Sequence, residues 1–492
     1  VPISTKLLFR DKDYKEITFA IEICEDLWSV FPPSNNHALN GASIIFNLSS
    51  SNEIVGKDSY RRNLVSMQSA KTLSAYIYVS SGIMESTSDL VFGGASLIYE
   101  NGKLLKSNKR FEIESNLIYA DIDVKRLINE RCRNSSFSGS LYDGDYKIVE
   151  VNVSDKVKKL DRTYKMYPFI PVSDKEKRFE EILEIQSSAL ARRIIHLNST
   201  KCVIGMSGGL DSTLAFLVIV RAFRKLNLDT KNIIGVTMPG FGTTDRTYNN
   251  AINLLKEYGA TLKEVSIKEA SLLHMKDIGL DINDRSVTYE NIQARERTQI
   301  LMDIANMVGG IVIGTGDLSE LALGWCTYNG DHMSMYSVNS SIPKTLVRHL
   351  VCYVRDNSTY KRKKILTDIL DTPISPELLP PDEAGNILQK TESSIGPYVL
   401  HDFFLYHLLR YGASFKKIYF LAKITFKDSF ENDEIKKWLK VFVRRFYTQQ
   451  FKRNAVPDGV KVGTISLSPR GDLRMPSEAS YESILEELDK IS

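Results

Sequence analysis

Residues 202–217, CVIGMSGGLDSTLAFL, combine an apolar strand, a glycine turn and a helix, and they decide the fold. The apolar run 202–204 predicts a strand, and the run 213–217 predicts a helix. Gly208 and Gly209 allow a sharp turn that brings bare backbone N–H groups against an anion, and the helix adds the positive end of its dipole. The sequence therefore predicts a phosphate site at this turn.

Three polar side chains accompany the turn. The hydroxyls of Ser207 and Ser212 can donate to phosphate oxygens, whereas Asp211 beside a polyanion requires a divalent cation between them. The stretch has neither the spacing nor the lysine of a Walker A loop, G-x-x-x-x-G-K-[ST]. The alternative is an ordinary glycine-rich turn, which the flanking strand and helix disfavour.

The hexapeptide SGGLDS at 207–212 resembles the pyrophosphate loop of the ATP pyrophosphatases. Enzymes of that family cleave ATP between its α and β phosphates and activate a carboxyl or carbonyl oxygen as an adenylate. The resemblance implies ATP as a co-substrate.

Composition limits the class of protein. A chain of 492 residues suggests roughly two to four domains. The 64 Lys and Arg residues nearly balance the 60 Asp and Glu residues, so we expect no nucleic-acid partner, and no apolar run is long enough to predict a membrane span. The five cysteines are Cys24, Cys132, Cys202, Cys326 and Cys352. They are scattered and lack the spacing of metal ligands, which favours a reducing compartment, so we expect a cytoplasmic protein.

Further strands follow the glycine turn. Residues 232–238, 261–267 and 310–314 read as strands that alternate with helices, which predicts a doubly wound parallel sheet with ligands at its carboxyl edge. Thr315 and Glu320 follow the last of these strands. Beside a triphosphate, Asp211 and Glu320 could hold Mg²⁺ from two loops, although a Glu at a helix start could equally serve the helix dipole alone.

The first part of the chain also reads as α/β. Residues 17–24, 42–48 and 75–80 predict strands, and residues 93–99 and 117–122 predict a hairpin-like pair around the turn 100–102. Turn formers and prolines mark residues 133–172 as a linker between domains 1–132 and 173–492. Ser173 reads as the N-cap of a helix that extends to about residue 197.

Three motifs resemble the nitrilase-like glutaminase domain of glutamine-dependent NAD synthetases: EICEDLW at 22–28, NLS at 47–49 and ESTSDL at 85–90. The resemblance implies that Cys24 attacks the glutamine amide and that Ser51 and Lys57 bind glutamine. Without these motifs, an isolated cysteine would more often be an inert buried residue.

One departure from that family is the region before Cys24. The family's general-base Glu and its Lys lie well upstream, and Lys15, Glu16 and Glu22 do not match their contexts. Either the chain is amino-terminally truncated or its glutaminase half is degenerate, and we favour truncation because Cys24 and its neighbours are intact and Val1 replaces an initiating Met. We expect very weak glutamine hydrolysis, with ammonia as the nitrogen source of this chain.

The second part resembles the ligase domain of the same family, through NIQARER at 291–297, GTGDLSE at 314–320, WCTY at 325–328, VNSSIPKT at 338–345 and QFKR at 450–453. The implied ATP-binding residues are Gly205, Met206, Ser207, Gly208, Gly209, Leu210, Asp211, Ser212, Thr315, Lys344 and Ser375. The implied contacts to deamido-NAD are Asn291, Arg295, Glu320, Trp325, Cys326, Thr327, Tyr328 and Lys452, and the implied Mg²⁺ ligands are Asp211 and Glu320.

The resemblance implies a partial nitrilase-like α/β sandwich followed by an ATP pyrophosphatase domain with a doubly wound parallel sheet. It implies ATP-dependent amidation of deamido-NAD to NAD through an adenylate, with release of AMP and pyrophosphate, by a homo-oligomer. Other pyrophosphate-loop amidotransferases, such as GMP or asparagine synthetase, are not expected to carry a nitrilase-like half. A tRNA-modifying relative would need a basic face with stacking aromatics, and a non-catalytic scaffold would be expected to lack Asp211 or Glu320.

Overall fold

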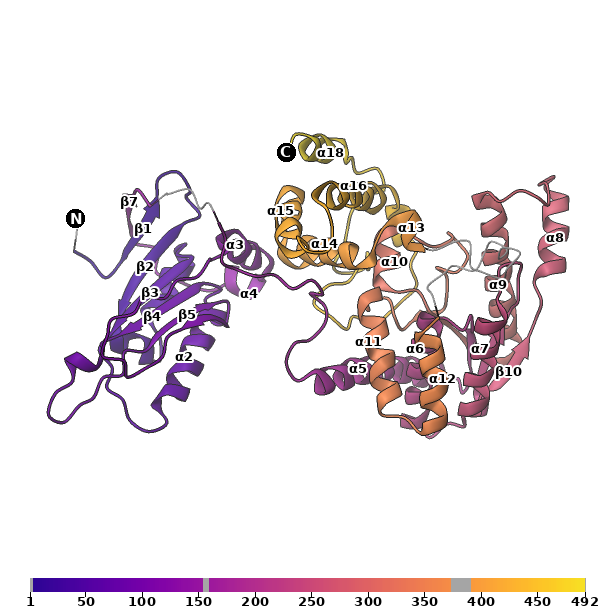
Figure 1. Ribbon diagram of the computed structural model, residues 1–492, viewed down its shortest axis with the longest axis horizontal. Coiled ribbons are helices and arrows are strands. Elements are labelled where there is room, and N and C mark those ends of the chain that lie inside the picture. The colour runs from indigo at the N-terminus through magenta and orange to yellow at the C-terminus, as the bar shows by residue number, and fades with distance from the viewer. Residues whose placement is uncertain (1–2, 154–158, 373–390, 492) are drawn as a thin grey trace. The chain divides into compact units, whose positions relative to one another are not determined.

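The computed structural model describes residues 3–153, 159–372 and 391–491. The chain divides into two compact units, Val1–Thr163 and Tyr164–Ser492, which Figure 1 shows in indigo to magenta and in magenta to yellow. Each unit is built on its own sheet, and each is described separately below.

The first unit contains a seven-stranded mixed sheet in the order β6-β5-β4-β3-β2-β1-β7. Its three central strands, β2, β3 and β4, are parallel, and their β-branched residues fit the buried centre of a sheet. The strands are β1 (Leu7–Asp11), β2 (Thr18–Ile23), β3 (Ile44–Ser49), β4 (Ala75–Ser80), β5 (Ser96–Glu100), β6 (Lys103–Ser107) and β7 (Lys147–Val151).

Helices pack on one face of this sheet. Ala20, Ile45 and Tyr76 are buried there beneath α1 (Pro33–Leu39) and α2 (Lys57–Lys71), and α3 (Val124–Arg133) and α4 (Ser135–Ser138) follow later in the chain. The alternate residues on the central strands are exposed: Ile21 is 41%, Ile23 64%, Leu48 52% and Val79 42% accessible. One face of the sheet therefore carries an open apolar patch, formed by Ile21, Ile23, Leu48 and Val79.

Two details of this unit differ from the sequence-based expectation. Asn101 and Gly102 both have positive φ, so a two-residue turn pairs β5 with the immediately following β6, and residues 117–122 do not form the second strand of the hairpin. Residues 133–163, read as part of a linker, contain α4 and β7, and β7 pairs in parallel with β1 at the edge of the sheet.

The second unit contains a five-stranded parallel sheet in the order β10-β9-β8-β11-β12, which confirms the predicted doubly wound architecture. The strands are β8 (Cys202–Gly205), β9 (Ile233–Thr237), β10 (Thr261–Glu264), β11 (Ile311–Gly314) and β12 (Tyr336–Ser337). Its α/β helices are α5 (Lys175–Leu197), α6 (Leu210–Lys225), α7 (Asp245–Tyr258), α8 (Lys268–Asp277), α9 (Val287–Val308), α10 (Leu318–Leu323), α11 (Lys344–Asp356) and α12 (Tyr360–Leu370).

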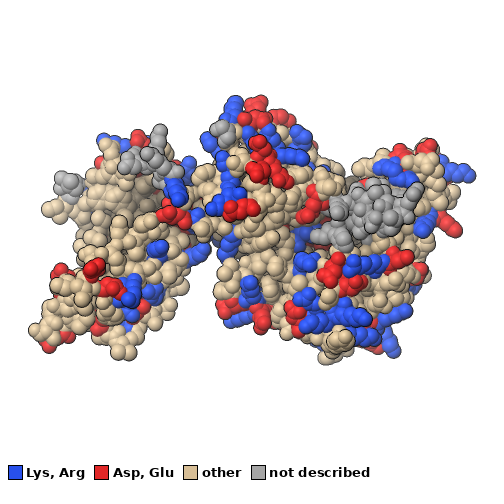
Figure 2. Space-filling view, viewed as in Figure 1, with Lys and Arg blue, Asp and Glu red and all other residues tan. Residues whose placement is uncertain are grey.

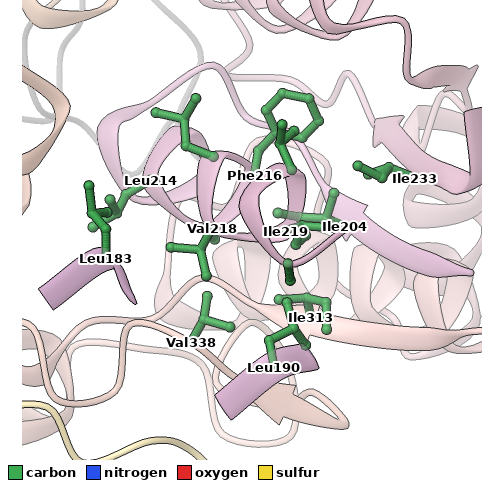
Figure 3. Packing of buried hydrophobic residues seen from close by; sticks show 14 of the residues in the cluster. Leu183, Leu190, Ile204, Leu214, Phe216, Val218, Ile219, Ile233, Ile313 and Val338 are labelled. Atoms are coloured by element: carbon green, nitrogen blue, oxygen red, sulfur yellow. The ribbon is translucent and has the colours of Figure 1, made fainter. Parts of the chain in front are cut away.

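Helix α6 is the centre of the core. Twelve of the 16 residues of α6 are buried, including a continuous run from Ser212 to Val220, as expected for a helix that is covered along most of its length. Figure 3 shows its Leu214, Val218 and Ile219 packed among side chains from α5 and from strands β8 and β11. Helix α5 begins at Lys175 after Asp174 in a left-handed conformation without a side-chain cap, so the expected Ser173 cap is not formed.

The chain ends in a helical layer that the sequence pattern did not delineate. This layer contains α13 (Thr391–Ile395), α14 (Tyr398–Tyr411), α15 (Phe415–Thr425), α16 (Asn432–Thr448), α17 (Gln450–Asn454) and α18 (Glu482–Asp489). Its apolar core includes Phe403, Phe442 and Leu323, so it packs on α10.

Figure 2 shows Lys and Arg side chains interspersed with Asp and Glu over the visible surface of the second unit. Among the described helices, none has the length and apolar character needed to cross a membrane.

Candidate active site at the switch point of the second sheet

The site lies where the strand order of the second sheet reverses. The chain runs outward from β8 to β9 and β10, and it returns to the other side of β8 to form β11 and β12. In open α/β sheets, ligands bind at such a switch point, outside the carboxyl ends of the strands. The loops that follow β8 and β11 therefore flank the expected crevice.

The loop after β8 is held close to α7. Gly208 has φ +82°, and a Cβ atom at this position would lie 2.0 Å from the carbonyl oxygen of Thr247. No side chain fits between these two backbones. The predicted requirement for glycine at this turn is thus a steric one in the folded chain.

Hydroxyl groups organise the same loop. Ser207 Oγ accepts a hydrogen bond from the Gly209 N–H at 3.2 Å and lies 3.1 Å from Ser212 Oγ, which also donates to the Gly209 carbonyl. Helix α6 begins after Gly209 without a side-chain cap. Its first N–H groups therefore have no side-chain cap, which leaves the predicted anion site as an expectation at this turn.

Three carboxylates meet above this loop. One oxygen each from Asp211, Asp317 and Glu320 lies within 4.8 Å of the others. Lys344 Nζ lies among them, 2.7 Å from Asp211 Oδ2, 2.7 Å from Asp317 Oδ2 and 2.8 Å from Glu320 Oε1. The structure thus brings together the three residues predicted from two loops and a helix start, and it adds Asp317.

Burial perturbs these groups. Burial and the charge of Glu320 raise the pKa of Asp317 well above its usual range, and burial raises the pKa of Glu320 to about 7 against the opposing charge of Lys344. For Lys344, burial lowers the pKa, but the carboxylates of Asp211, Asp317 and Glu320 outweigh burial and raise it overall. The ammonium of Lys344 therefore remains charged.

Sequence reasoning assigned no role to Asp317 or Asn339. Asp317 Oδ1 accepts from the N–H of Glu320 at 2.8 Å and so caps α10, a role that its place in the word GTGDLSE could have indicated. Asn339 Nδ2 donates to the carbonyls of Asp211 at 3.0 Å and Thr315 at 3.2 Å. Asn339 thereby joins the two loops of the site. No local sequence pattern predicts this contact.

The residues expected to contact deamido-NAD form a second group. Asn291 Oδ1 accepts from Thr327 Oγ1 at 2.8 Å, and Arg295 Nε donates to the Tyr328 carbonyl at 3.3 Å. Helix α9 therefore supports the loop 325–328, which continues from α10. The Tyr328 ring stacks on His332 with 5.2 Å between ring centroids and is 42% exposed.

Three cations of the carboxyl-terminal layer hold either this loop or the end of α10 that leads into it. Lys452 Nζ donates to the carbonyls of Gly324 at 2.8 Å and Cys326 at 2.7 Å. Arg445 Nε donates to the Leu323 carbonyl at 2.9 Å, and its guanidinium lies 5.1 Å from the Trp325 ring centroid. Buried Arg453 donates to the Ala322 carbonyl at 2.8 Å. Positive side chains at the end of α10 match its dipole and fix the loop.

The remaining residues predicted to bind ATP lie at the end of β8, in the loop after β11 and outside the described part of the chain. Gly205 ends β8, and Met206 donates its N–H to Val236 on β9 at 2.9 Å. Thr315 and Glu320 line a cavity of about 50 Å³ that also contacts Cys326. Burial raises the pKa of the Cys326 thiol far above its ordinary value, so this side chain lines the cavity as an uncharged thiol. Ser375 lies outside the described residues.

The first unit places Cys24 immediately after β2. Cys24 has φ +46°, a conformation that non-glycine residues rarely adopt and that often marks functional turns. Asn47 Nδ2 donates to its carbonyl at 3.4 Å. The strained turn therefore presents the thiol at the end of the strand.

The other residues predicted for glutamine lie on the loop after β3 and at the start of α2. The Ser51 N–H donates to Ser80 Oγ at 3.3 Å, while Lys57 Nζ donates to the Asn52 carbonyl at 2.8 Å. Glu22 accepts from the Ser34 N–H at 2.8 Å and from the Tyr76 hydroxyl, and burial raises its pKa. Glu22 is thus engaged by Ser34 and by Tyr76 between the sheet and its helices.

Comparison with known proteins identifies the family. The family model described as NAD synthase matches residues 182–381. The glutamine-dependent NAD(+) synthetase of Mycobacterium leprae is 39% identical over 99% of this chain and 77% of its own length, and that of Mycobacterium tuberculosis (strain H37Rv) is 39% identical over 100% and 77%.

A solved structure supports the fold. The crystal structure of a glutamine-dependent NAD(+) synthetase from Cytophaga hutchinsonii superposes with a TM-score of 0.54 at 20% identity, over 97% of this chain and 74% of that chain. Fold, site geometry and sequence identity agree, and the chain belongs to the glutamine-dependent NAD(+) synthetases, a family of ligases.

Proposed function

We propose that this chain converts deamido-NAD to NAD, using ATP to activate the pyridine carboxylate as an adenylate. The observation that carries the proposal is the group of Asp211, Asp317, Glu320 and Lys344 above an anion-binding turn at the switch point of the sheet. A reaction that releases pyrophosphate needs two features at one place: backbone N–H groups that bind the phosphates, and positive charge beside the anionic leaving group.

The donor set fits Mg²⁺. Three carboxylates face a single ammonium, which leaves two negative charges uncompensated when all are ionised, and Asp211 Oδ1 is buried without a hydrogen-bond partner. Hard oxygen ligands from Asp211 and Glu320, completed by phosphate oxygens and water, are typical of Mg²⁺ sites. When bound, the ion would neutralise charge on the triphosphate.

The chain's own residues supply the rest of the chemistry. The turn 207–212 binds the phosphates through backbone N–H groups and the hydroxyls of Ser207 and Ser212. The carboxylate oxygen of deamido-NAD attacks the α-phosphorus of ATP, and pyrophosphate leaves with its charge offset by Lys344. Ammonia then attacks the adenylate carbonyl, loses a proton, and expels AMP to leave the amide.

Binding of deamido-NAD falls to the loop 325–328. This loop is fixed on one side by Asn291 and Arg295 and on the other by Lys452. Trp325 and Tyr328 supply aromatic surface for the pyridine ring. In this arrangement Lys452 acts on the substrate through the loop that it holds.

We propose ammonia as the nitrogen donor that this chain can use, and glutamine for the family's complete reaction, with Cys24 as nucleophile and Ser51 and Lys57 as glutamine contacts. The strained turn at Cys24 supports a role for its thiol. Glutamine hydrolysis also needs a general base and an oxyanion donor, and Glu22 is occupied by Ser34 and Tyr76. A homo-oligomer, which the family resemblance implies, and a cytoplasmic location, which the cysteine pattern favours, complete the proposal.

The test is a side-by-side assay of NAD formation from deamido-NAD and ATP, supplied with either ammonium chloride or glutamine. We expect NAD, AMP and pyrophosphate in equal amounts with ammonium, and almost no NAD with glutamine. Formation of ADP would exclude the adenylate mechanism. Equal rates with both donors would show that the first unit contains a working general base.

A further inference from the structure

Asp402 on α14 is a buried carboxylate outside the residues assigned above. It is 1% exposed and accepts hydrogen bonds from three groups. Ser319 Oγ donates to its Oδ1, while the Thr345 N–H at 3.1 Å and Thr345 Oγ1 at 2.6 Å donate to its Oδ2. Each donor residue is next in sequence to a residue of the ligase site: Ser319 precedes Glu320, and Thr345 follows Lys344.

The start of α11 needs these partners. Its N-cap residue is Pro343, which makes no side-chain cap, so the first N–H groups of the helix depend on other elements. The Lys344 N–H donates to Ser319 Oγ at 2.9 Å, and the Thr345 N–H donates to Asp402. Asp402 thus caps α11 from another helix, where a negative charge is favourable.

The single proton of Ser319 fixes the direction of this chain of bonds. A hydroxyl has one proton, and Ser319 donates it to Asp402. The Ser319 oxygen is therefore left to accept from the Lys344 N–H. The carboxylate orients the hydroxyl, and the hydroxyl joins the first turn of α10 to the first turn of α11.

Helix α14 also touches the ammonium itself. Tyr398, one turn before Asp402, lies with its ring centroid 5.4 Å from Lys344 Nζ. The helix therefore supports Lys344 at its backbone through Asp402 and at its side chain through Tyr398. Nothing in the local sequence around Lys344 supplies either contact.

We propose that Asp402 is a positioning residue of the ligase reaction, which holds Glu320 and Lys344 in register by binding the starts of α10 and α11. The inference rests on the proposed function. Because an amide can accept at only one of its two terminal atoms, Asp402→Asn places an NH₂ group against either the Ser319 hydroxyl or the Thr345 donors. The metal and phosphate groups then lose their alignment, whereas the loop 325–328 keeps its own supports.

The experiment measures steady-state NAD formation by the full chain with ammonium chloride. For Asp402→Asn we expect kcat to fall at least tenfold and KM for ATP to rise about fivefold, with KM for deamido-NAD within twofold. A lower folded fraction would change neither KM, so this selectivity separates positioning from stability. Asp368→Asn is the control, because Asp368 pairs with Arg246 at an exposed site on α12, and its parameters should be unchanged.

A second comparison tests the route through Ser319. In the wild-type background, Ser319→Ala should raise KM for ATP, and in the Asp402→Asn background it should add less than a twofold change, because both variants break one chain of bonds. Unchanged KM for ATP in Asp402→Asn, or fully additive effects, would overturn the inference. If Asp402→Asn fails to fold, Thr345→Val removes one of the bonds to Asp402, and an unchanged KM for ATP would overturn it equally. Absence of AMP formation by the wild-type chain would instead refute the proposed function.

Discussion

The substitution Gly208→Ala tests the anion-binding turn most directly. The new methyl group would lie 2.0 Å from the Thr247 carbonyl oxygen, more than 1 Å inside a normal contact, and Gly208 has φ +82°. The left-handed conformation alone costs about 1–2 kcal/mol for a residue with a Cβ. The clash adds a displacement of the turn by about 1 Å, and misplacement on that scale can cost about 100-fold in rate.

The assay is AMP release with ammonium chloride as nitrogen donor, together with thermal unfolding. We expect kcat/KM for ATP to fall about 100-fold in Gly208→Ala. Gly309→Ala is the matched control, because Gly309 also has positive φ (+65°) but open space around it. It should lose about 1 kcal/mol of stability while keeping its activity. Activity of Gly208→Ala within twofold of wild type would refute the assigned role of the turn.

Three further predictions concern the site and its support. Asp211→Asn should lower AMP release at least about 100-fold without a lower melting temperature, since the variant removes a carboxylate that we propose as a ligand of Mg²⁺ beside the triphosphate; unchanged turnover would exclude Asp211 as a ligand. Arg445→Met should raise KM for deamido-NAD about tenfold with a smaller change in kcat, because the loop 325–328 loses its contact at Trp325 and the end of α10 loses its bond at Leu323; unchanged KM would contradict this view of the loop. Burial lowers the pKa of His401 to about 4, so the neutral form contributes stability that is complete above pH 6.5 and is lost as the pH falls toward 4. Between pH 7 and pH 4.5 this loss is about 2.5 kcal/mol, and urea unfolding of wild type and His401→Gln at the two pH values should show it in the wild type only.

Much of the second unit was predictable because its signals are local. The three central strands β8, β9 and β11 are short, mainly apolar runs followed by a loop and a helix, and the glycines at 208 and 209 mark the turn. Asp211, Glu320 and Lys344 belong to motifs that resemble a known family, and the structure brings them within hydrogen-bonding distance. In the first unit, the turn at 100–102 was located correctly from its asparagine and glycine, but residues 117–122 were taken as the second strand in place of residues 103–107, which follow the turn directly.

The residues that were missed act over long distances along the chain. Asn339 reaches the carbonyl of Asp211 across 128 positions, and Asp402 reaches Ser319 across 83. Each is one polar residue within an apolar or mixed segment, and its role depends on a partner that no periodicity reveals. Asp317 was missed although its role as a helix cap is local, because only Glu320 was considered at this helix start.

The open apolar patch on the first sheet has a practical consequence for solution work. This patch consists of Ile21, Ile23, Leu48 and Val79. Exposed apolar surface favours association between molecules, and salts that are excluded from protein surfaces strengthen this association. Sulfate is such a salt, so titrating ammonium sulfate as a nitrogen donor would change the colloidal state of the sample together with the substrate concentration. Chloride salts at constant ionic strength avoid that confusion, and light scattering across the titration would detect it.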